Sequence, residues 1–516
     1  MNRQRTMQRV KMHNQQYGNV KKCGISILFL LLSIVANASE TIIDTLSRIN
    51  LPLLTIETIN NEMPVCDYVE APNGCWGITT QNATKVPGQL KISLMGKTLY
   101  DSGEYEKNAS GITIKIRGNT SAYYGEKKPY KIKLQREADL LLRGNDLKYS
   151  DKEWILIKDK NLMYKTGFKL NELLQLPWTP SCEYVNVVVN GEYMGVYLLT
   201  EAVSLNPNCR IDVDETGYLF EYDAYWWNEP VYVECEIVNK PMHYTFKYPD
   251  IDDLSTSQLN YFSQTIHLTE QSIINGTYPD YIDIESFARW ILGHDIVGNS
   301  DGGGANFILT KRDNSNNSKI QMACLWDFDG NYRNEDDWDG CHDAFYFSLL
   351  FDNKNTDFLE RYKAIYNEIS LTIFDSIINY LEDFATTDIA EALSVSIALD
   401  NKKYGTEYYD VNGSIDFAKN WFLKRQIWLN DSIPAITPKY LDVNDAESRT
   451  PIIYASGKNI VVMNSTDDIC IYDAMGRLVY RDGRDTLGHD SPITINNTGV
   501  YVIKTGNTVK RVVVNF

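Results

Sequence analysis

The sequence predicts an α+β protein in which a β-rich region, a mainly helical region and a small β-sandwich follow one another. Strand-like apolar runs crowd residues 51–201, helical patterns fill most of residues 206–433, and short strand-like runs return after residue 450. A chain of 516 residues is long enough for several domains with separate cores. We therefore expect a β-rich N-terminal lobe over residues 39–205, a mainly helical lobe over 206–433, a linker over 434–449 and the sandwich over 450–516.

The first 38 residues have the layout of a secretory signal. Lys21 and Lys22 precede an apolar run of twelve residues, Gly24–Val35, and the small-residue sequence Ala36–Asn37–Ala38 follows. Such a run is too short to span a bilayer, and no later run is long and apolar enough either. We therefore expect cleavage after Ala38 and a chain that is secreted or displayed at the cell surface, with no integral membrane segment after cleavage.

The net charge of −18 and the nine cysteines limit the partners of the chain. An acidic protein repels nucleic acid and anionic lipid surfaces, so we expect neither as a partner. None of the cysteines forms the C-x-x-C pattern of a zinc site. Disulfides are the default in exported proteins, and on nearness along the chain we predict Cys66–Cys75 and Cys182–Cys209. Cys324–Cys341 is a further candidate pair, and the sequence leaves the connectivity open.

The N-terminal lobe contains a candidate phosphate clamp. Ile112–Ile116 alternates as a half-buried strand does and runs into the glycine-containing turn Arg117–Ser121. In the next strand, Tyr130–Leu134, Lys131 and Lys133 share one face, opposite three apolar side chains. Arg117 and the two lysines beside this turn are suited to bind phosphate oxygens. The alternative interpretation is an ordinary solvated strand face.

The rest of this lobe consists of a strand, a helix and a hairpin. Trp154–Lys158 predicts the strand, and Asp159 can cap a helix over residues 161–176 that ends before Pro177. Two strand-like runs then flank Asn190–Gly191, a strong signal for a tight hairpin turn. The second run ends at Glu201, which we place near the junction with the helical lobe.

The most informative stretch is Gly293–Gly330 in the helical lobe. Asp301 stands five residues before Asn306, across three consecutive glycines, and Asn306 leads into the apolar run Phe307–Leu309. A second apolar run, Met322–Trp326, ends in Asp327–Phe328–Asp329–Gly330. The two runs predict a β-hairpin with acidic or amide groups at its mouth. We expect four side chains to converge there: Asp301, Asn306, Asp327 and Asp329.

This order of residues is typical of phosphoryl transfer. A catalytic aspartate orients the attacking hydroxyl, and an asparagine and a downstream aspartate bind the metal ions that bridge the phosphates. Asp301 is suited to the first role, and Asn306, Asp327 and Asp329 offer the oxygen ligands that Mg²⁺ or Mn²⁺ requires. The spacing D-x-x-x-x-N followed by a D-F-G-like motif is found in protein kinases. The alternatives are a hairpin with polar ends or a calcium-binding loop.

Six motifs, taken in order over residues 51–433, resemble the spore-coat protein H (CotH) kinase-like family: IRGNTS, KKPYKIKL, VNVVVNGEYMGVYLLTE, GYLFEYD, FKYPD and DGGGAN…WDFDG. The resemblance implies an atypical protein-kinase-like bilobal fold and transfer of a phosphoryl group from ATP to Ser or Thr of surface or coat proteins, with Mg²⁺ or Mn²⁺. It implies Asp301 as the catalytic residue, Asn306 and Asp327 as metal ligands with Asp329 as an accessory, Lys131 or Lys133 and Arg117 near the phosphates, and Glu201 near the nucleotide base.

The C-terminal region resembles a type IX secretion sorting domain. The similarity lies in the turn Ile471–Leu478, the strand Gly499–Lys504 and the closing run Lys510–Val514. It implies that secretion machinery in the outer membrane of a Gram-negative cell is a partner of this region.

Two other functions have to be weighed against an exported kinase. A non-catalytic surface adhesin or glycan-binding protein on the same scaffold would use some of the 34 tyrosines and 10 tryptophans for sugar stacking, although these residues suit a core equally well. A glycoside hydrolase would need paired carboxylates, and no Glu pair stands in a recognisable frame. Because ATP is scarce outside cells, a kinase of this kind would act before or during export, or use another nucleotide.

Overall fold

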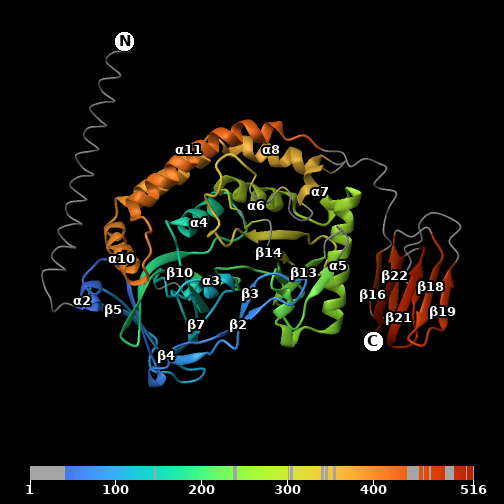
Figure 1. The fold of residues 1–516 in the computed structure, drawn as a ribbon, viewed down its shortest axis with the longest axis horizontal. Helices are drawn as coiled ribbons and strands as arrows, with labels where there is room; N and C mark the ends of the chain where they lie inside the picture. The colour runs from blue at the N-terminus through green and yellow to red at the C-terminus, as the bar shows by residue number, and fades with distance from the viewer. Residues whose placement is uncertain are drawn as a thin grey trace, which may run out of the picture.

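The computed structural model describes residues 41–144, 147–235, 241–299, 301–302, 306–338, 342, 347–352, 356–438, 452–456, 458–463, 467–482, 493–506 and 508–514. The predicted signal and residues 439–449 of the predicted linker lie outside these ranges. Within them, strands and helices are mixed as the sequence predicts, which confirms the α+β class (Figure 1).

The N-terminal part contains a closed barrel of seven strands, because the first strand of the sheet also pairs with the seventh. One pairing, β1 with β9, is parallel, and the other pairings around the ring are antiparallel. A short strand, β5 (Lys97–Asp101), extends the sheet beyond β4. In spatial order the barrel strands are β1 (Leu53–Thr58), β9 (Cys182–Val189), β10 (Glu192–Glu201), β8 (Asp151–Ile157), β7 (Tyr130–Ala138), β6 (Ile112–Ile116) and β4 (Val86–Leu94).

The period-2 pattern read from the sequence decides which side chains enter the barrel. Along β7, Tyr130, Ile132 and Leu134 are buried in the barrel core, so Lys131 and Lys133 point outward. The hairpin between β9 and β10 turns at Asn190 and Gly191, whose φ angles of 51° and 78° fit the primed turn that the sequence predicts.

A two-stranded strap leaves the barrel between β1 and β4. Its strands are β2 (Asp67–Glu70) and β3 (Ile78–Gln81), and it holds the loop around the short helix α3 (Thr120–Tyr123). The Thr79 hydroxyl donates to Asn119 Oδ1 at 2.7 Å, and the Thr80 hydroxyl donates to the Gly118 carbonyl at 3.0 Å. The strap therefore fixes the glycine-containing turn that the sequence singles out.

The second part is built on a five-stranded antiparallel sheet. Its central strand β11 (Tyr218–Tyr222) lies between β13 (Met242–Tyr248) and β14 (Phe307–Lys311), with β12 (Val233–Cys235) and β15 (Ile320–Cys324) at the edges. The β14–β15 hairpin confirms the pairing predicted from the two apolar runs. Helix α4 (Met163–Leu173) connects the two parts, because one continuous apolar core includes its residues, the outer side of β8 and β10, and this sheet.

Helices cover this sheet, and α8 and α11 arch over it (Figure 1). Helix α10 packs against β10 of the barrel, and a short helix, α2 (Ile42–Leu46), precedes β1. Side-chain caps begin several of the helices, among them Ser255 at α5, Asp283 at α6 and Asp410 at α11. The helices are α5 (Thr256–Asn275), α6 (Ile284–Val297), α7 (Phe347–Asp352), α8 (Asp357–Ile369), α9 (Ile373–Ala385), α10 (Asp388–Tyr404) and α11 (Val411–Ala435).

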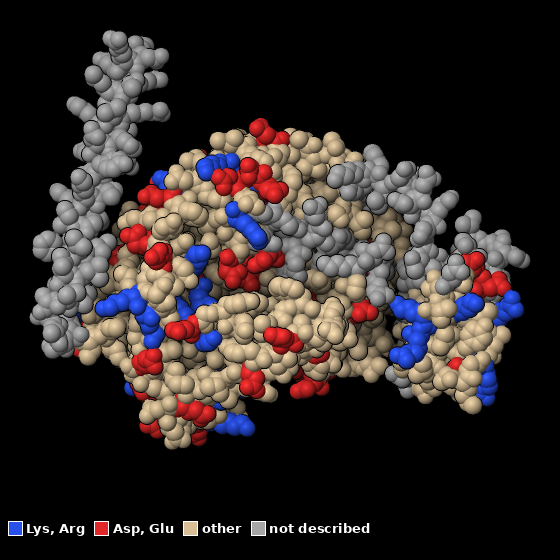
Figure 2. Space-filling model, viewed as in Figure 1, with Lys and Arg blue, Asp and Glu red and all other residues tan. Residues whose placement is uncertain are grey.

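The C-terminal residues form two small sheets that share an apolar core, which includes Ile453, Ile460, Ile471 and Ile503. Lys and Arg side chains are frequent on the face of these sheets seen in Figure 2. One sheet contains β16 (Ile452–Ser456), β17 (Asn459–Met463) and β20 (Ile493–Thr494), and the other contains β19 (Leu478–Asp482), β18 (Ile469–Asp473), β21 (Gly499–Thr505) and β22 (Thr508–Val514).

The predicted disulfides are wrong, because Cys66, Cys75, Cys182 and Cys209 all carry free thiols. Nearness along the chain was a poor guide, since Cys66 packs against the barrel core whereas Cys75 lies in the turn that follows β2. The third candidate pair is not testable, because Cys341 lies outside the described residues. In the ranges that the structure describes, none of the helices combines the length and the apolar character needed to cross a membrane.

Candidate active site

The open end of the β14–β15 hairpin brings the predicted acidic motifs together. Ile308 pairs with Cys324, so Asn306 and the residues after Cys324 lie at the same end of the sheet. Asn306 and Asp327 have φ angles of 67° and 63°, in the left-handed region that non-glycine residues seldom adopt. Such backbone strain tends to concentrate at functional sites, where the surrounding structure enforces it.

Two hydrogen bonds fix Asp327 in place. The Tyr164 hydroxyl, on the first turn of α4, donates to Asp327 Oδ1 at 2.6 Å. The buried Asn299 amide donates to the Asp327 carbonyl at 2.7 Å, while its Oδ1 accepts the backbone N–H of Asp301 at 3.0 Å. Asn299 therefore ties the Asp301 loop to the Asp327 turn. Sequence reasoning missed both residues, although an Asn two positions before Asp301 is a signal for a local side-chain turn.

The three aspartates form one electrostatic cluster. The pKa of Asp329 is raised to about 8, first by the charge of Asp327, then by partial burial and by the charge of Asp301. The pKa of Asp301 is also raised, mainly because its carboxylate is partly removed from water and then because Asp327 repels it, while Arg333 acts in the opposite direction. The geometry therefore concentrates negative charge that a cation would neutralise.

The donor set fits a hard divalent cation. Carboxylate oxygens of Asp327 and Asp329 are the ligands that Mg²⁺ and Mn²⁺ prefer, and the amide of Asn306 lies at the same end of the hairpin. Among the described residues, no three His, Cys, Asp or Glu side chains are arranged to hold a metal ion by themselves. Mg²⁺ is commonly held by one or two carboxylates, with waters and substrate phosphates as the other ligands, and this cluster suits that mode.

A cationic group that the sequence analysis missed faces this cluster. Lys158, at the end of β8, donates to the Ser121 carbonyl in α3, and its charge acts on Asp329. Burial and the neighbouring charges of Lys127 and Lys128 lower the pKa of Lys158 to about 8. The available signal was its position directly after the apolar run Trp154–Ile157, where a strand end meets the glycine-containing turn.

The predicted phosphate clamp divides into two parts. Arg117 is the first residue of the turn, and its charge acts on the Tyr164 hydroxyl, so it lies near the acidic cluster. Lys131 and Lys133 instead pair with Glu153 on the outer face of the barrel, with N···O distances of 2.8 and 3.6 Å. Neither lysine lines the pocket described below.

Glu201, expected near a nucleotide base, is buried at the end of β10. Arg143 Nη1 donates to its Oε1 at 2.9 Å, and the backbone N–H of Ser181 donates to its Oε2 at 3.0 Å. Both carboxylate oxygens are therefore engaged by groups of the protein itself.

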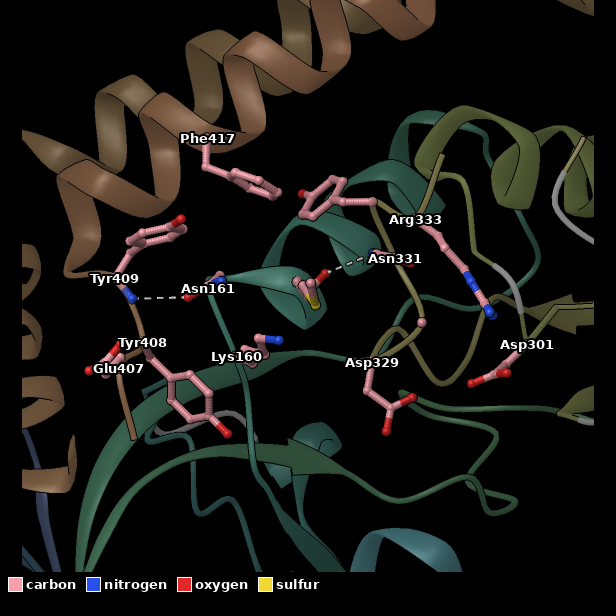
Figure 3. A pocket seen from close by; sticks show the side chains of 13 residues that line it. Lys160, Asn161, Asp301, Asp329, Asn331, Arg333, Glu407, Tyr408, Tyr409 and Phe417 are labelled. Atoms are coloured by element: carbon pink, nitrogen blue, oxygen red, sulfur yellow. Dashed lines mark hydrogen bonds between the residues drawn. The ribbon is translucent and has the colours of Figure 1, made fainter. Parts of the chain in front are cut away.

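A pocket of about 630 Å³ opens beside Asp301 and Asp329 (Figure 3). The Arg333 side chain extends toward Asp301, and Tyr409 and Phe417 lie at the opposite side of the pocket from Asp301. The lining residues are Lys160, Asn161, Met163, Asp301, Asp329, Gly330, Asn331, Tyr332, Arg333, Glu407, Tyr408, Tyr409 and Phe417.

A family model described as CotH kinase protein matches residues 114–429, more than half of the chain. The chain therefore belongs to the CotH kinase family, as the sequence motifs indicate. The match includes every residue of the site discussed above and ends before the C-terminal sheets. No curated protein matches the chain.

Proposed function

We propose that this chain is a metal-dependent phosphotransferase that moves the terminal phosphoryl group of ATP to a Ser or Thr hydroxyl of a surface or secreted protein. The observation that carries the proposal is the convergence of three carboxylates, Asp301, Asp327 and Asp329, at the open end of the β14–β15 hairpin, where the charge of Lys158 also acts on Asp329. Membership of the CotH kinase family supports it.

The order of elements is compatible with a kinase-like bilobal arrangement. Strands β6 and β7 flank the glycine-containing turn, Lys158 directly follows the last residue of β8, and α4 is the next helix. In protein kinases a glycine-rich loop between two strands covers the phosphates and the next strand carries the phosphate-binding lysine. Lys158 fills that position better than Lys131 or Lys133, which lie on the strand after the turn.

The donor nucleotide is proposed to bind with its phosphates between this turn and the acidic cluster. Lys158 and Arg117 would contact phosphate oxygens, and both are close enough to act electrostatically on the cluster or on Tyr164. Asp327 and Asp329 would hold Mg²⁺ or Mn²⁺, which when bound supplies the positive charge that neutralises phosphate oxygens.

Asp301 is proposed to orient the acceptor hydroxyl and to take its proton. A new bond forms between the hydroxyl oxygen and the terminal phosphorus, the bond from that phosphorus to the bridging oxygen breaks, and ADP leaves. The raised pKa of Asp301 favours this role, because a carboxylate that binds a proton more readily is a better general base.

Transfer of label from γ-labelled ATP to a mixture of Ser- and Thr-containing peptides tests the proposal. We expect Asp301→Asn to lose on the order of a hundredfold or more of the rate, the range typical of general acid–base groups. Asp327→Asn should also lose most of the rate, because it removes a proposed metal ligand. Asp431→Asn, a change at an exposed position of α11, is the matched control and is expected to retain the native rate. Equal background in all four proteins would favour the non-catalytic alternative, a surface adhesin or glycan-binding protein.

We further propose that the C-terminal sheets direct export by type IX secretion. What supports this is the turn predicted as the central feature of a sorting domain, in which Asp473 Oδ1 accepts the backbone N–H groups of Met475 and Arg477 at 2.9 Å each. A reporter with an N-terminal secretory signal, fused to residues 450–516 and expressed in a cell with this machinery, should reach the medium or the surface. Retention of the reporter in the periplasm would contradict the proposal.

A further inference from the structure

The pocket in Figure 3 lies on one side of the acidic cluster, and the phosphate-binding groups lie outside it. Lys158 and Lys128 donate to carbonyls of Ser121, Ala122 and Gly125 around α3, and none of these residues lines the pocket. The carboxylate of Asp329 points away from the aromatic residues of the pocket (Figure 3). Because phosphoryl transfer is in line, the nucleophile approaches the phosphorus from the side opposite the leaving group. On the proposed function, the pocket is therefore on the acceptor side.

The pocket is larger than a Ser or Thr side chain requires. Its volume of about 630 Å³ lies in the range of sites that enclose a small molecule or several side chains. An acceptor hydroxyl at Asp301 would leave most of this space for neighbouring residues of the acceptor segment. The shape and chemistry of the far wall should then decide which neighbours are accepted.

Three aromatic rings form that wall. Tyr332 and Phe417 have ring centroids 5.7 Å apart, and Tyr409 and Phe417 have centroids 5.8 Å apart. Tyr409 is 49% exposed, which is high for a ring of this size, and Phe417 is half-buried. Aromatic rings prefer edge and offset contacts at such separations, so another ring can extend this row.

Hydrogen bonds fix the backbone segment that contributes Tyr409 to the wall. The backbone N–H of Tyr409 donates to Asn161 Oδ1 at 3.1 Å, a contact drawn in Figure 3. The carbonyl of Tyr408 accepts Asn401 Nδ2 at 2.8 Å, which ties the same segment to α10. Both contacts fix the backbone that carries Tyr409 before any ligand binds, which lowers the entropic cost of recognition.

We infer that this pocket selects acceptor segments that carry an aromatic side chain close to the phosphorylated Ser or Thr. The aromatic side chain lies against Tyr409 and Phe417 while the acceptor hydroxyl reaches Asp301. The inference rests on the proposed phosphotransferase function and adds the class of acceptor. A saccharide, which also stacks on aromatic rings, is the competing acceptor.

A positional-scanning library of Ser- and Thr-centred peptides with labelled ATP and Mn²⁺ tests the inference. We expect an aromatic residue at one fixed position to raise the rate about tenfold over alanine, which corresponds to one good aromatic contact. Tyr409→Ala should lose this preference, whereas Tyr409→Phe should keep it. Tyr232→Ala, which removes a ring that is 41% exposed and lies outside the pocket, should keep the full preference.

The thermal shift produced by ATP with Mn²⁺ separates failure of this inference from failure of the proposed function. If the native protein labels peptides without an aromatic preference, or keeps the preference in Tyr409→Ala, the inference is wrong and the phosphotransferase proposal stands. If it labels only oligosaccharides, the inference is wrong and so is the Ser or Thr acceptor of the proposed function, whereas phosphoryl transfer from ATP stands. If nothing is labelled and ATP with Mn²⁺ gives no shift, both are wrong. If ATP with Mn²⁺ shifts the melting temperature equally in the native protein and in Tyr409→Ala, the substitution affects binding of the acceptor and not binding of the nucleotide.

Discussion

At the scale of single residues, the site depends on carboxylates that are close enough to resist ionising together. Asp327 is held by Tyr164 and Asn299, and its charge is the main reason that the pKa of Asp329 is raised to about 8. Two like charges at one site usually shift one pKa strongly upward, and a bound cation removes the conflict. This arrangement has consequences that can be measured without any substrate.

The first prediction concerns stability against pH. An unfolded aspartate has a pKa of about 3.9, so the folded protein holds a proton on Asp329 that the unfolded chain has already lost. Stability should therefore fall as pH rises from about 4 to about 8 in the metal-free protein. Urea denaturation at several pH values across this range should show that the free energy of unfolding falls less with pH in Asp329→Asn than in the native protein. Asp223 and Asp159, whose pKa values are raised to about 7 and about 6, contribute in the same direction in both proteins.

Addition of Mg²⁺ or Mn²⁺ at pH 8 provides the internal control. The ion should restore stability in the native protein, because it replaces the missing proton as a source of positive charge. In Asp329→Asn the ion should raise stability by less. Identical pH profiles and identical metal effects in the two proteins would show that Asp329 is not part of a cation site.

The second prediction concerns Lys158. Its pKa is lowered to about 8, so it is charged at neutral pH and loses its charge as pH rises through that value. Affinity for ATP should fall above about pH 8 in the native protein and stay level in Lys158→Arg, because arginine remains protonated there. Lys158→Met should bind ATP about tenfold to a hundredfold more weakly at pH 7, the loss of one charged hydrogen bond. Titration calorimetry from pH 7 to 9.5 measures all three, and a flat native profile would remove Lys158 from the site.

At the scale of elements, helix α4 is the part that positions the acidic turn. Phe328, between the two aspartates of the motif, packs edge-on against Tyr164 and Phe168 of this helix. Gly167 lies directly beneath the ring, where an added Cβ atom would be only 2.3 Å from Phe328. The close approach of helix and turn therefore requires glycine at this position.

The third prediction follows from that contact. In a solvent-exposed helix, Gly→Ala stabilises by up to about 1 kcal/mol. In α4 we expect Gly167→Ala to destabilise by about 1–3 kcal/mol, because the methyl group forces Phe328 and the acidic turn to move. Chemical denaturation measures whether the free energy of unfolding rises or falls in Gly167→Ala. Adding Phe328→Leu, which makes room for the methyl group, should recover part of the loss, and a stabilising Gly167→Ala would contradict the packing described here.

Local elements could be read from the sequence, whereas their assembly could not. The β14–β15 hairpin and the Asn190–Gly191 turn are set by neighbouring residues, so apolar runs and turn residues were sufficient to predict them. The closure of the barrel depends on β1 pairing with both β4 and β9, which are remote in the chain. No periodicity within a strand specifies such partners.

The same difference between local and distant contacts explains which residues of the candidate site the sequence indicates. Asp301, Asp327 and Asp329 lie close together because a single hairpin joins their segments, and the sequence displays that hairpin. Tyr164 meets Asp327 across 163 positions of sequence, and Lys158 reaches the α3 turn from a separate strand. The shared face of Lys131 and Lys133 predicts a phosphate clamp, but on that face both lysines pair with Glu153. Charge pattern alone does not show that Glu153 pairs with both lysines, because Glu153 lies on the neighbouring strand.

At the scale of the whole molecule, the site lies where two parts of the chain share a core. The apolar core around α4 continues from the outer side of β8 and β10 into the five-stranded sheet and the helices. The groups proposed to bind the nucleotide phosphates come from the barrel, and the acidic cluster comes from the sheet. Any rotation of one part against the other would change the distance between Lys158 and Asp329.

One buried ion pair helps to fix that relationship. Lys127, in the loop between α3 and β7, donates to Asp400 Oδ1 of α10 at 2.8 Å, and the same oxygen accepts the backbone N–H of Val196 at 3.0 Å. Both side chains are almost fully buried, with 11% and 3% of their surface exposed. Burial lowers the pKa of Lys127, and Asp400 counteracts this effect. The pair therefore joins the loop that follows the glycine-containing turn to a helix of the other part.

The fourth prediction uses this pair to test whether the site depends on the junction. Asp400→Ala leaves a buried ammonium without its partner, which should cost about 3–5 kcal/mol. The double variant Lys127→Met/Asp400→Leu buries no charge, so it should be much closer to the native protein in stability. If the pair also sets the distance between Lys158 and the carboxylates, the double variant will bind ATP more weakly although it is folded. Denaturation and ATP titration of the three proteins separate the effect on stability from the effect on ATP affinity. If the double variant is stable and binds ATP with native affinity, apolar packing alone fixes the relative position of the two parts.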